Sequence, residues 1–556
     1  MIKYYITILA VVFIIFLYNS ITFRKRELQR LKKKIRDSFG SAPDREYTVE
    51  ELNKIAYYYK VSKSKDFSID QITWNDLDMD SIFMLVNNTY SSLGEEYLYK
   101  KLRMPCFEEK QLKKDEKLYS YFEEHTEKVY TLQEIFSGLG HTRNISMYEF
   151  IYRLEEVDRQ GNLVHYVQSV LFLTSIVLLF TAPIIGIIAF FAVLIMNIGT
   201  YYKCKARIEN YFICFAYLSD MIHCAEKIIS IQDEEIDEYL EGLKDSAKKL
   251  KRVSNGSFLI ASNGSHGSLG EIVMDYVRMI FHVDIINFNA MLQKMIDNRA
   301  SIDKMFEILG ELEAAMAVAS FRTMLQFYTV PEFKAEPCVS TEEVFHPLIS
   351  EPVANSMDEK KCVLITGSNA SGKSTFLKTI AINLILAQTI HTCTAGKFAM
   401  SFCKTYTSMA LRDDLMSNES YFIVEIKSLK RILDAITKEV PVICFVDEVL
   451  RGTNTVERIA ASSYILKYLS KKNVICFAAT HDIELTNILE KDYSNYHFSE
   501  EVSDNDVLFN YKLNRGRATS RNAIKLLGVI GFDEEIVSKA EHMAEKFIDS
   551  GDWELS

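Results

Sequence analysis

The sequence predicts a C-terminal α/β domain preceded by a mostly α-helical region, with an N-terminal transmembrane helix and an internal transmembrane hairpin. Residues 362–366, 442–446 and 474–479 are short, wholly apolar, β-rich runs, each followed by a turn and a helical pattern, which is typical of buried parallel strands. Upstream, apolar residues recur at helical spacing and Gly and Pro are scarce, which indicates helices. Two stretches, 4–23 and 160–202, carry no Asp, Glu, Lys or Arg and are long enough to enter a membrane.

These changes along the chain predict six consecutive segments. Residues 1–23 are a transmembrane signal anchor, 24–47 a basic juxtamembrane segment and 48–165 the first half of a helical core or lever. Residues 166–201 form the transmembrane hairpin, 202–345 the second half of the lever and 346–556 the α/β domain.

The composition excludes several classes of protein. With 556 residues, 48% of them hydrophobic, and only 21 Gly and 8 Pro, the chain is neither a peptide nor a collagen-like or largely disordered protein. Its formal net charge of −11 gives the whole chain no electrostatic attraction for DNA. The ten cysteines include no C-x-x-C pair and no zinc-ligand spacing, which predicts reduced thiols in a cytosolic protein body.

Residues 4–23 predict an uncleaved anchor. The run spans about 30 Å as a helix, and its basic residues follow it, unlike those of a cleaved signal peptide. Residues 24–36 hold eight bases and one acid, against Lys3 alone on the other side, so the positive-inside rule puts the rest of the chain in the cytoplasm. Binding of anionic lipids is an alternative use of the same basic run.

The second uncharged stretch predicts a tight helical hairpin. As one helix its 43 residues would be about 64 Å long, twice the hydrocarbon thickness of a bilayer. Pro183 and Gly186 divide it into 166–182 and 184–201, and Lys203, Lys205 and Arg207 follow. The sequence leaves open whether this hairpin crosses the bilayer or only dips into it, since both return the chain to the same side.

Residues 367–374 predict a phosphate-binding loop. The run KCVLIT leads into GSNASGKS and then into a helical pattern, which matches G-x-x-x-x-G-K-[ST] in a strand, loop and helix context. In such a loop backbone N–H groups face phosphate oxygens, Lys373 reaches the β- and γ-phosphates, and the Ser374 hydroxyl can hold Mg²⁺. ATP and Mg²⁺ are therefore the predicted cofactors, and cytosolic ATP requires an even number of crossings after residue 23.

Polar residues follow the other two apolar runs. Residues 442–446 lead into Asp447 and Glu448, where one carboxylate can order Mg²⁺ and the other can activate the attacking water. Residues 474–479 lead into His481 at the same edge of the sheet, where ligands of α/β proteins bind. His481 is thus a candidate sensor of the γ-phosphate, with a structural histidine as the alternative.

Several motifs together resemble the ATPase domain of the MutS mismatch-repair family. In chain order they are TGSNASGKST, DDLMSNESYFIVE, VDEVLRGTNT, ATHDIELT and FNYKLNRGRAT. Upstream, ITWNDLDMDSIFMLVNNTYSSLGEEYLYKKLRMP, GELEAAMAVASFR and HPLI resemble that family's core, its lever and the strand that leads into the ATPase domain. The resemblance implies an ABC-type P-loop ATPase that works as a dimer, with composite sites at the dimer interface.

With this resemblance, the candidate site residues are as follows. Nucleotide binding is predicted for Gly367, Ser368, Asn369, Ala370, Ser371, Gly372, Lys373, Ser374 and Thr375, for Ser420 as the serine that contacts the partner's γ-phosphate, and for Tyr511 as a stacking partner of adenine. Catalysis is predicted for Glu448, Asp447, Lys373 and His481, and metal binding for Ser374 and Asp447. The chain departs from the family at Tyr421, which follows Ser420 where Thr is usual, and at Ser368 and Ala370, where Pro and Met are usual.

The expected function is that of a membrane-anchored MutS-like ATPase that hydrolyses ATP in a dimeric site and transmits the change through helical levers. No counterpart of the family's mismatch-reading domain is predicted, and the hairpin lies where the family inserts its DNA clamp. A membrane or an unknown membrane or cytosolic protein is then the expected partner. Two alternatives stay open: a membrane-tethered DNA-binding ATPase of repair or recombination, and a nucleotide-binding membrane scaffold with little hydrolysis. The predicted location is the cell membrane, with three spans and a cytoplasmic ATPase domain.

Overall fold

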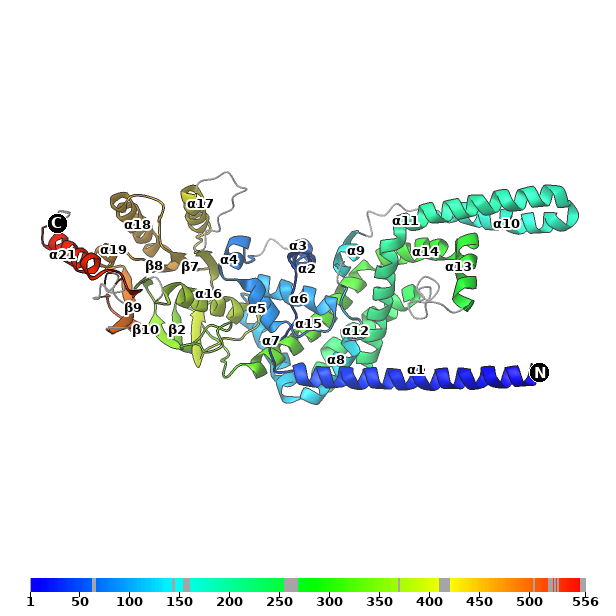
Figure 1. Ribbon diagram of the computed structural model, residues 1–556, viewed down its shortest axis with the longest axis horizontal. Coiled ribbons are helices and arrows are strands. Elements are labelled where there is room, and N and C mark those ends of the chain that lie inside the picture. Colours follow the sequence, from blue (N-terminus) through cyan, green and yellow to red (C-terminus); the bar gives the residue numbers. More distant parts are fainter. Residues whose placement is uncertain are drawn as a thin grey trace. The chain divides into compact units, whose positions relative to one another are not determined.

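The computed structural model describes residues 2–62, 67–142, 146–153, 161–254, 269–368, 371–409, 421–503, 506–518, 524, 527 and 530–550. The chain forms two compact units (Figure 1). The first comprises Met1–Ser62, Asn87–Lys100 and Leu118–Phe321, and the second comprises Lys63–Val86, Lys101–Lys117 and Arg322–Ser556. The second unit therefore contains two short segments that lie far upstream of the predicted α/β domain. Three of the five unit boundaries fall inside helices, namely α6 (Ser92–Arg103), α7 (Glu109–Glu124) and α15 (Arg299–Met324).

The first unit is built from helices, as the upstream sequence predicts. Besides parts of α6, α7 and α15 it contains α1 (Ile2–Ser38), α2 (Val49–Ile55), α3 (Tyr57–Ser62), α8 (Thr126–Phe136), α9 (Met147–Arg153), α10 (Leu163–Thr181), α11 (Pro183–Ile229), the short 3₁₀ helix η2 (Glu234–Ile236), α12 (Asp237–Ser254), α13 (Leu269–Phe281) and α14 (Val283–Asp297).

The segment GELEAAMAVASFR forms part of α15, in agreement with its helical periodicity. Leu309, Leu312 and Met316 are fully buried, because residues three or four apart lie on one face of a helix. Gly310 permits close packing here, since a Cβ at this position would lie 2.6 Å from the Cβ of Tyr97. This helix is therefore a core element of the first unit.

The two uncharged stretches are helical. α1 is one continuous helix, but most side chains of residues 4–21 lie outside the described part of the structure, so the anchor stays a prediction. α10 and α11 form the hairpin: Nε2 of Gln168 donates to Oγ1 of Thr200 at 3.0 Å, and the rings of Phe172 and Phe190 lie 5.5 Å apart. α11 continues well past residue 201, the predicted end of the hairpin.

The second unit contains the predicted α/β domain. Its larger sheet has the strand order β10-β9-β4-β8-β7-β6, with β4 (Cys362–Thr366), β6 (Lys404–Ser408), β7 (Val442–Asp447), β8 (Val474–Ala479), β9 (Tyr493–Ser503) and β10 (Asp506–Arg515). The three predicted strands β4, β8 and β7 are adjacent, parallel and buried, which confirms the prediction. Because they are parallel, the residues that follow β4 and β7 meet at one edge of the sheet.

A smaller sheet and several helices complete this unit. The smaller sheet has the order β1-β5-β2-β3, with β1 (Glu332–Lys334), β2 (Val339–Val344), β3 (Asn355–Glu359) and β5 (Lys397–Ser401). The helices are α4 (Gln71–Asp76), α5 (Met79–Val86), α16 (Lys373–Thr389), α17 (Tyr421–Asp434), α18 (Thr455–Ser470), α19 (Ile483–Ile488) and α21 (Glu534–Ser550). The interpretation of HPLI as a strand is wrong, because residues 346–349 form a turn after β2. All nine cysteines that the structure describes are free thiols.

A buried cation stabilises the second unit. The side chain of Arg322 is fully buried; its Nη1 and Nη2 donate to the two carboxylate oxygens of Glu116 at 2.8 and 2.7 Å. Nε of Arg322 donates to Oγ1 of Thr392 at 2.8 Å. Burial acts to raise the pKa of Glu116, but hydrogen bonds from Arg322 and His391 outweigh it and lower this pKa to about 2.

Replacing Glu116 with Ala is expected to lower the free energy of unfolding of this unit by about 3 kcal/mol, because the buried guanidinium of Arg322 loses its counter-ion. The loss should be full at pH 7, since a carboxyl with a depressed pKa stabilises the fold above its ordinary value of 4.5. It should shrink as the pH falls towards 2, where the wild-type carboxyl is itself protonated. Urea titrations followed by circular dichroism measure it, with Glu109→Ala, an exposed position, as the control. Equal midpoints for the two variants would contradict this interpretation.

Candidate functional site

The loop predicted to bind phosphate joins β4 to α16. Gly367 and Gly372 have φ angles of +148° and +102°, a backbone region that L side chains rarely adopt, so both positions require glycine. Nζ of Lys373 donates to the carbonyl oxygens of Gly367 at 2.8 Å and Ser368 at 2.6 Å. Oγ of Ser371 donates to the same Ser368 oxygen at 2.8 Å. The ammonium group of Lys373 is therefore held against the loop at the N-terminus of α16.

A hydroxyl and a carboxylate join this loop to β7. Oγ of Ser374, in the first turn of α16, donates to Oδ2 of Asp447, the last residue of β7, at 2.5 Å. Burial raises the pKa of Asp447, although the hydrogen bond from Ser374 and the positive charge of Lys373 act in the opposite direction. Hydroxyl and carboxylate oxygens are the ligand types that Mg²⁺ prefers, so this pair can hold a magnesium ion.

The carboxylate of Glu448 contacts an imidazole and a guanidinium group. Its Oε1 lies 2.8 Å from Nε2 of His481, and its Oε2 lies 3.0 Å from Nε of Arg451. The backbone N–H of Glu448 donates to the carbonyl oxygen of Ala479 at 3.0 Å, which ties the end of β7 to that of β8. Glu448 has φ +55°, so the chain turns sharply as it leaves the strand. The structure thus brings His481 into direct contact with Glu448.

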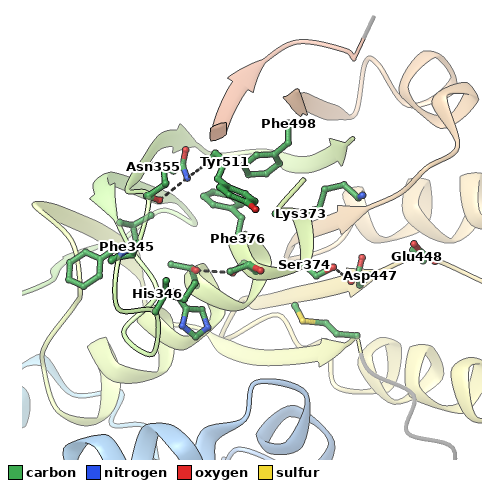
Figure 2. Close-up of a pocket in the computed structure, with 18 of the residues that line it drawn as sticks. Phe345, His346, Asn355, Lys373, Ser374, Phe376, Asp447, Glu448, Phe498 and Tyr511 are labelled. Carbon is green, nitrogen blue, oxygen red and sulfur yellow. Dashed lines mark hydrogen bonds between the residues drawn. The ribbon is translucent and has the colours of Figure 1, made fainter. Parts of the chain in front are cut away.

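A cavity of about 730 Å³ lies beside these groups (Figure 2). Its polar end is lined by Lys373, Ser374, Thr375, Asp447 and Glu448. Figure 2 shows Tyr511 close to Phe498 and Phe376 in the middle of the site, with His346 and Phe345 at the end away from Glu448. The cavity is therefore charged at one end and aromatic or apolar at the other.

Tyr511 covers the phosphate-binding loop. A Cβ at Gly372 would lie 3.2 Å from Cδ1 of Tyr511, so the tyrosine ring packs directly over this glycine. The residue is in a left-handed conformation, with φ +52°, and its carbonyl oxygen accepts a hydrogen bond from Nδ2 of Asn355 at 3.0 Å. Its side chain is 44% exposed, which leaves part of the ring free to contact a ligand in the cavity.

The turn after β2 supplies a wall that the sequence analysis missed. HPLI was noticed only as a family likeness, yet His346 and Ile349 line the cavity. Burial and the positive charge of Lys378 lower the pKa of His346 to about 4, so this imidazole is neutral at pH 7.

Three predicted site residues lie outside the described part of the chain. They are Asn369 and Ala370 in the phosphate-binding loop and Ser420 before α17. Their predicted contacts therefore stay predictions.

Glu425 is a further residue of the site to which the sequence analysis assigned no role. It lies on α17, is 4% exposed and lines the cavity. Its Oε1 accepts a hydrogen bond from the backbone N–H of Leu450, which has φ +59°. Its Oε2 is buried and makes no hydrogen bond within the described residues, and burial raises the pKa of this carboxyl. The signal for it was present, because Glu425 is the one acid within the otherwise apolar run YFIVEI.

Comparisons with known proteins identify the domain that carries this site. Residues 363–548 match the family model for MutS domain V. The DNA mismatch repair protein MutS of Clostridium kluyveri (strain ATCC 8527) is 30% identical over 253 residues, which are 42% of this chain and 29% of that protein. The protein of the same name from Clostridium botulinum (strain Langeland) is 27% identical over 265 residues, 45% of this chain and 28% of that protein. The chain thus spans less than a third of the length of these relatives. The C-terminal part of the chain, residues 363–548, is therefore a domain of the MutS domain V family.

Proposed function

We propose that this protein binds ATP with Mg²⁺ and hydrolyses it, and that it acts as a homodimer attached to a membrane. The observation that carries the proposal is the convergence of Lys373, the Ser374–Asp447 pair and Glu448 on one cavity. These groups come from α16 and from the end of β7. Because the two elements are far apart in the sequence, only the fold brings the groups together.

The residues of the cavity fit a magnesium nucleotide. The ammonium of Lys373 and the N–H groups at the start of α16 would bind phosphate oxygens. Ser374 and Asp447 would hold Mg²⁺, which neutralises phosphate charge when bound. The aromatic part of the cavity, with Tyr511, would hold the adenine ring. In Figure 2 Ser374 lies between Tyr511 and Glu448, so the terminal phosphate would point towards Glu448.

Glu448 is proposed as the base that orients the attacking water. His481 and Arg451 contact one carboxylate oxygen each, which fixes the orientation of the side chain. A role of His481 as a positioning residue for Glu448 is compatible with the proposed sensing of the γ-phosphate, because the ring contacts Glu448, which lines the cavity.

The proposed homodimer would complete each site with residues of the other copy. The side chain of Arg451 is 64% exposed beside the cavity, and α18 next to it exposes Val456 (79%) and Tyr464 (78%). A partner copy could cover this face. The predicted contact of Ser420 with the partner's γ-phosphate belongs to the same proposal.

Membrane attachment is proposed through α1 and the hairpin. Leu163–Thr181 and Pro183–Ala206 are long and apolar enough to cross a membrane, and they are the two such segments found in the described residues. Only 22% and 17% of their apolar windows are buried, whereas the core helix of a soluble protein is mostly buried. The N-terminal part of α1 and the hairpin extend in the same direction in Figure 1, and both belong to the first unit. The proposed location is the cell membrane, with the ATPase domain in the cytoplasm.

DNA is the second candidate partner, because the relatives are named DNA mismatch repair proteins. The net charge of −11 gives no support to binding by the chain as a whole. The deciding experiment measures binding of the detergent-purified full chain to matched, mismatched and branched DNA at two salt concentrations, with and without ATP, alongside ATP turnover. ATP turnover with only weak, salt-sensitive DNA binding supports the proposal. Tight, nucleotide-dependent binding to one DNA structure would favour the DNA-binding alternative, and absent turnover would favour the scaffold.

Replacing Glu425 with Ala is expected to lower kcat for ATP hydrolysis about 10- to 100-fold with little change in KM, because the backbone that carries Glu448 loses a charge-assisted hydrogen bond. Glu425→Gln, which keeps an acceptor oxygen, should restore most of the rate. The control is Asp434→Ala, an exposed acid near the other end of α17. A large rise in KM with unchanged kcat would show instead that Glu425 acts on nucleotide binding.

A further inference from the structure

The base of the α10–α11 hairpin is covered by α13. Oγ of Ser169 on α10 donates to the carbonyl oxygen of Phe281 at 3.2 Å, and Nδ2 of Asn197 on α11 donates to that of Ile280 at 2.9 Å. The rings of Phe172 and Phe281 lie 5.6 Å apart in an edge-to-face contact. In Figure 1 α13 runs across the direction of the hairpin, and the outer part of the hairpin projects beyond it. The C-terminal end of α13 therefore contacts the hairpin at about residue 172 of α10. We call this position along the hairpin the α13 level.

Charged groups lie at this level or just behind it. Asp275 of α13, with a side chain 67% exposed, pairs with Arg278 at 3.0 Å. Asp284, at the start of α14, accepts a hydrogen bond from the hydroxyl of Tyr201 at 2.8 Å. An exposed carboxylate such as that of Asp275 is costly inside hydrocarbon, so α13 belongs in the headgroup region or in water. Tyr276, 59% exposed on the same helix, is the kind of residue that favours this interface.

Beyond this level the hairpin surface is uncharged and mostly apolar. We call residues 173–191 the hairpin tip; they contain no charged residue. Phe180, Ile184 and Ile188 are 84%, 79% and 67% exposed. The three hydroxyl groups of the tip all donate to carbonyl oxygens of their own helix, at Thr174, Ser175 and Thr181. The tip therefore exposes apolar side chains, and each of its hydroxyl groups has a hydrogen-bond acceptor within the tip's own helix. A segment that lies in hydrocarbon must meet both conditions.

The two helices of the hairpin are joined at the end of the tip without a polar connecting loop. The N–H of Ala182 donates to the carbonyl oxygen of Leu178 at 2.8 Å, Pro183 has no N–H, and the N–H of Gly186 donates to the carbonyl oxygen of Ala182 at 2.8 Å. The turn is tight, because a Cβ at Gly186 would lie 2.5 Å from the backbone nitrogen of Leu179. A hairpin that crosses the bilayer would expose this apolar turn to water on the far side.

The tip is about as long as half the thickness of the hydrocarbon core of a bilayer. From Phe172 to Thr181, α10 extends about 15 Å at about 1.5 Å per residue, whereas the hydrocarbon core is about 30 Å thick. With α13 at the headgroups, the turn would lie near the bilayer centre. We infer that the hairpin enters one leaflet only, with its tip among the acyl chains and α13 at the surface. This inference rests on the proposed membrane attachment and replaces a crossing hairpin by a re-entrant one.

Depth-dependent fluorescence quenching tests this inference on the full chain. Phe180→Trp labels the tip and Tyr202→Trp labels the base, and both positions are exposed, at 84% and 59%. Each variant is reconstituted into phosphatidylcholine–phosphatidylglycerol vesicles whose acyl chains carry bromine either near the headgroup or near the terminal methyl group. The wild-type signal is subtracted as the background of the native tryptophans. Phe180→Trp should be quenched more strongly by the deep bromines, and Tyr202→Trp more strongly by the shallow ones.

Two results would overturn the inference, and they differ in what they say about membrane attachment. Stronger quenching of Phe180→Trp by the shallow bromines would place the turn at the far headgroups, so the hairpin would cross and attachment would stand. No quenching of Phe180→Trp by either lipid would place the tip in water. Phe191→Trp, on the other arm of the tip, repeats the test if Phe180→Trp does not fold. ATP turnover, measured in the same vesicles, reports separately on the proposed enzymatic function.

Discussion

Replacing Glu448 with Gln is expected to slow ATP hydrolysis by about 100-fold or more while leaving ATP affinity close to that of the wild type, because a positioned base contributes about 10²- to 10⁴-fold to rate. Glutamine has nearly the same shape, so the contacts with His481 and Arg451 can be kept in altered form. Only the ability to accept a proton from the attacking water is lost. Phosphate release measures the rate, and binding of a fluorescent ATP analogue measures the affinity.

The matched control is Glu457→Gln, an exposed glutamate on α18 that contacts Thr453 and does not line the cavity. Its turnover should equal that of the wild type. Equal turnover of Glu448→Gln and the wild type would show that Glu448 is no catalyst and would favour a nucleotide-binding scaffold.

Replacing Lys373 with Ala is expected to weaken ATP binding about 100-fold, because the β- and γ-phosphates lose a charge-assisted contact of about 1.5–3 kcal/mol. In the structure the amine lies against the carbonyl oxygens of Gly367 and Ser368, and Lys373 is the one lysine among the described residues that line the cavity. Fluorescence anisotropy of an ATP analogue measures the dissociation constant.

Lys361→Ala is the control for this variant, since Lys361 is exposed and immediately precedes β4, at the opposite end of the strand from the loop. Its affinity should be unchanged. Because Lys373 also contacts the loop backbone, thermal unfolding of both variants without nucleotide should be compared. Lost binding with an unchanged unfolding temperature identifies a contact to phosphate, whereas unchanged binding would contradict the proposed role of Lys373.

Much of the site could be predicted because its parts are local in sequence. A glycine-rich loop between an apolar strand and a helix is recognisable from neighbouring residues, and Gly367 and Gly372 adopt the positive φ angles that such a loop demands. The acids after residues 442–446 were predicted in the same way, because a buried strand that ends in charged residues leaves them at the edge of a sheet.

Other parts could not be predicted, because their partners are distant in sequence. In the sequence Glu425 is one residue of a motif, and only the fold brings its carboxylate to the N–H of Leu450, 25 residues further along the chain. HPLI was interpreted as a strand, whereas it is a turn whose His346 lines the cavity. Residues 63–86 and 101–117 also join the second unit; for example, Oδ2 of Asp76 accepts hydrogen bonds from Thr407 and Met409 at the end of β6.

The sequence by itself determined the helical region, the three central strands, the phosphate-binding loop and the likeness of the C-terminal domain to MutS, because periodicity, glycine placement and motif order are carried by residues that are close along the chain. Only the tertiary structure decided which side chains meet. The order β4-β8-β7 brings Ser374 to Asp447, and it brings Glu448 to His481. The packing of α13 on the hairpin likewise decided how much apolar surface is left exposed. Such contacts depend on strand order and helix packing, which follow from burial of the whole core and leave no local signature in the sequence.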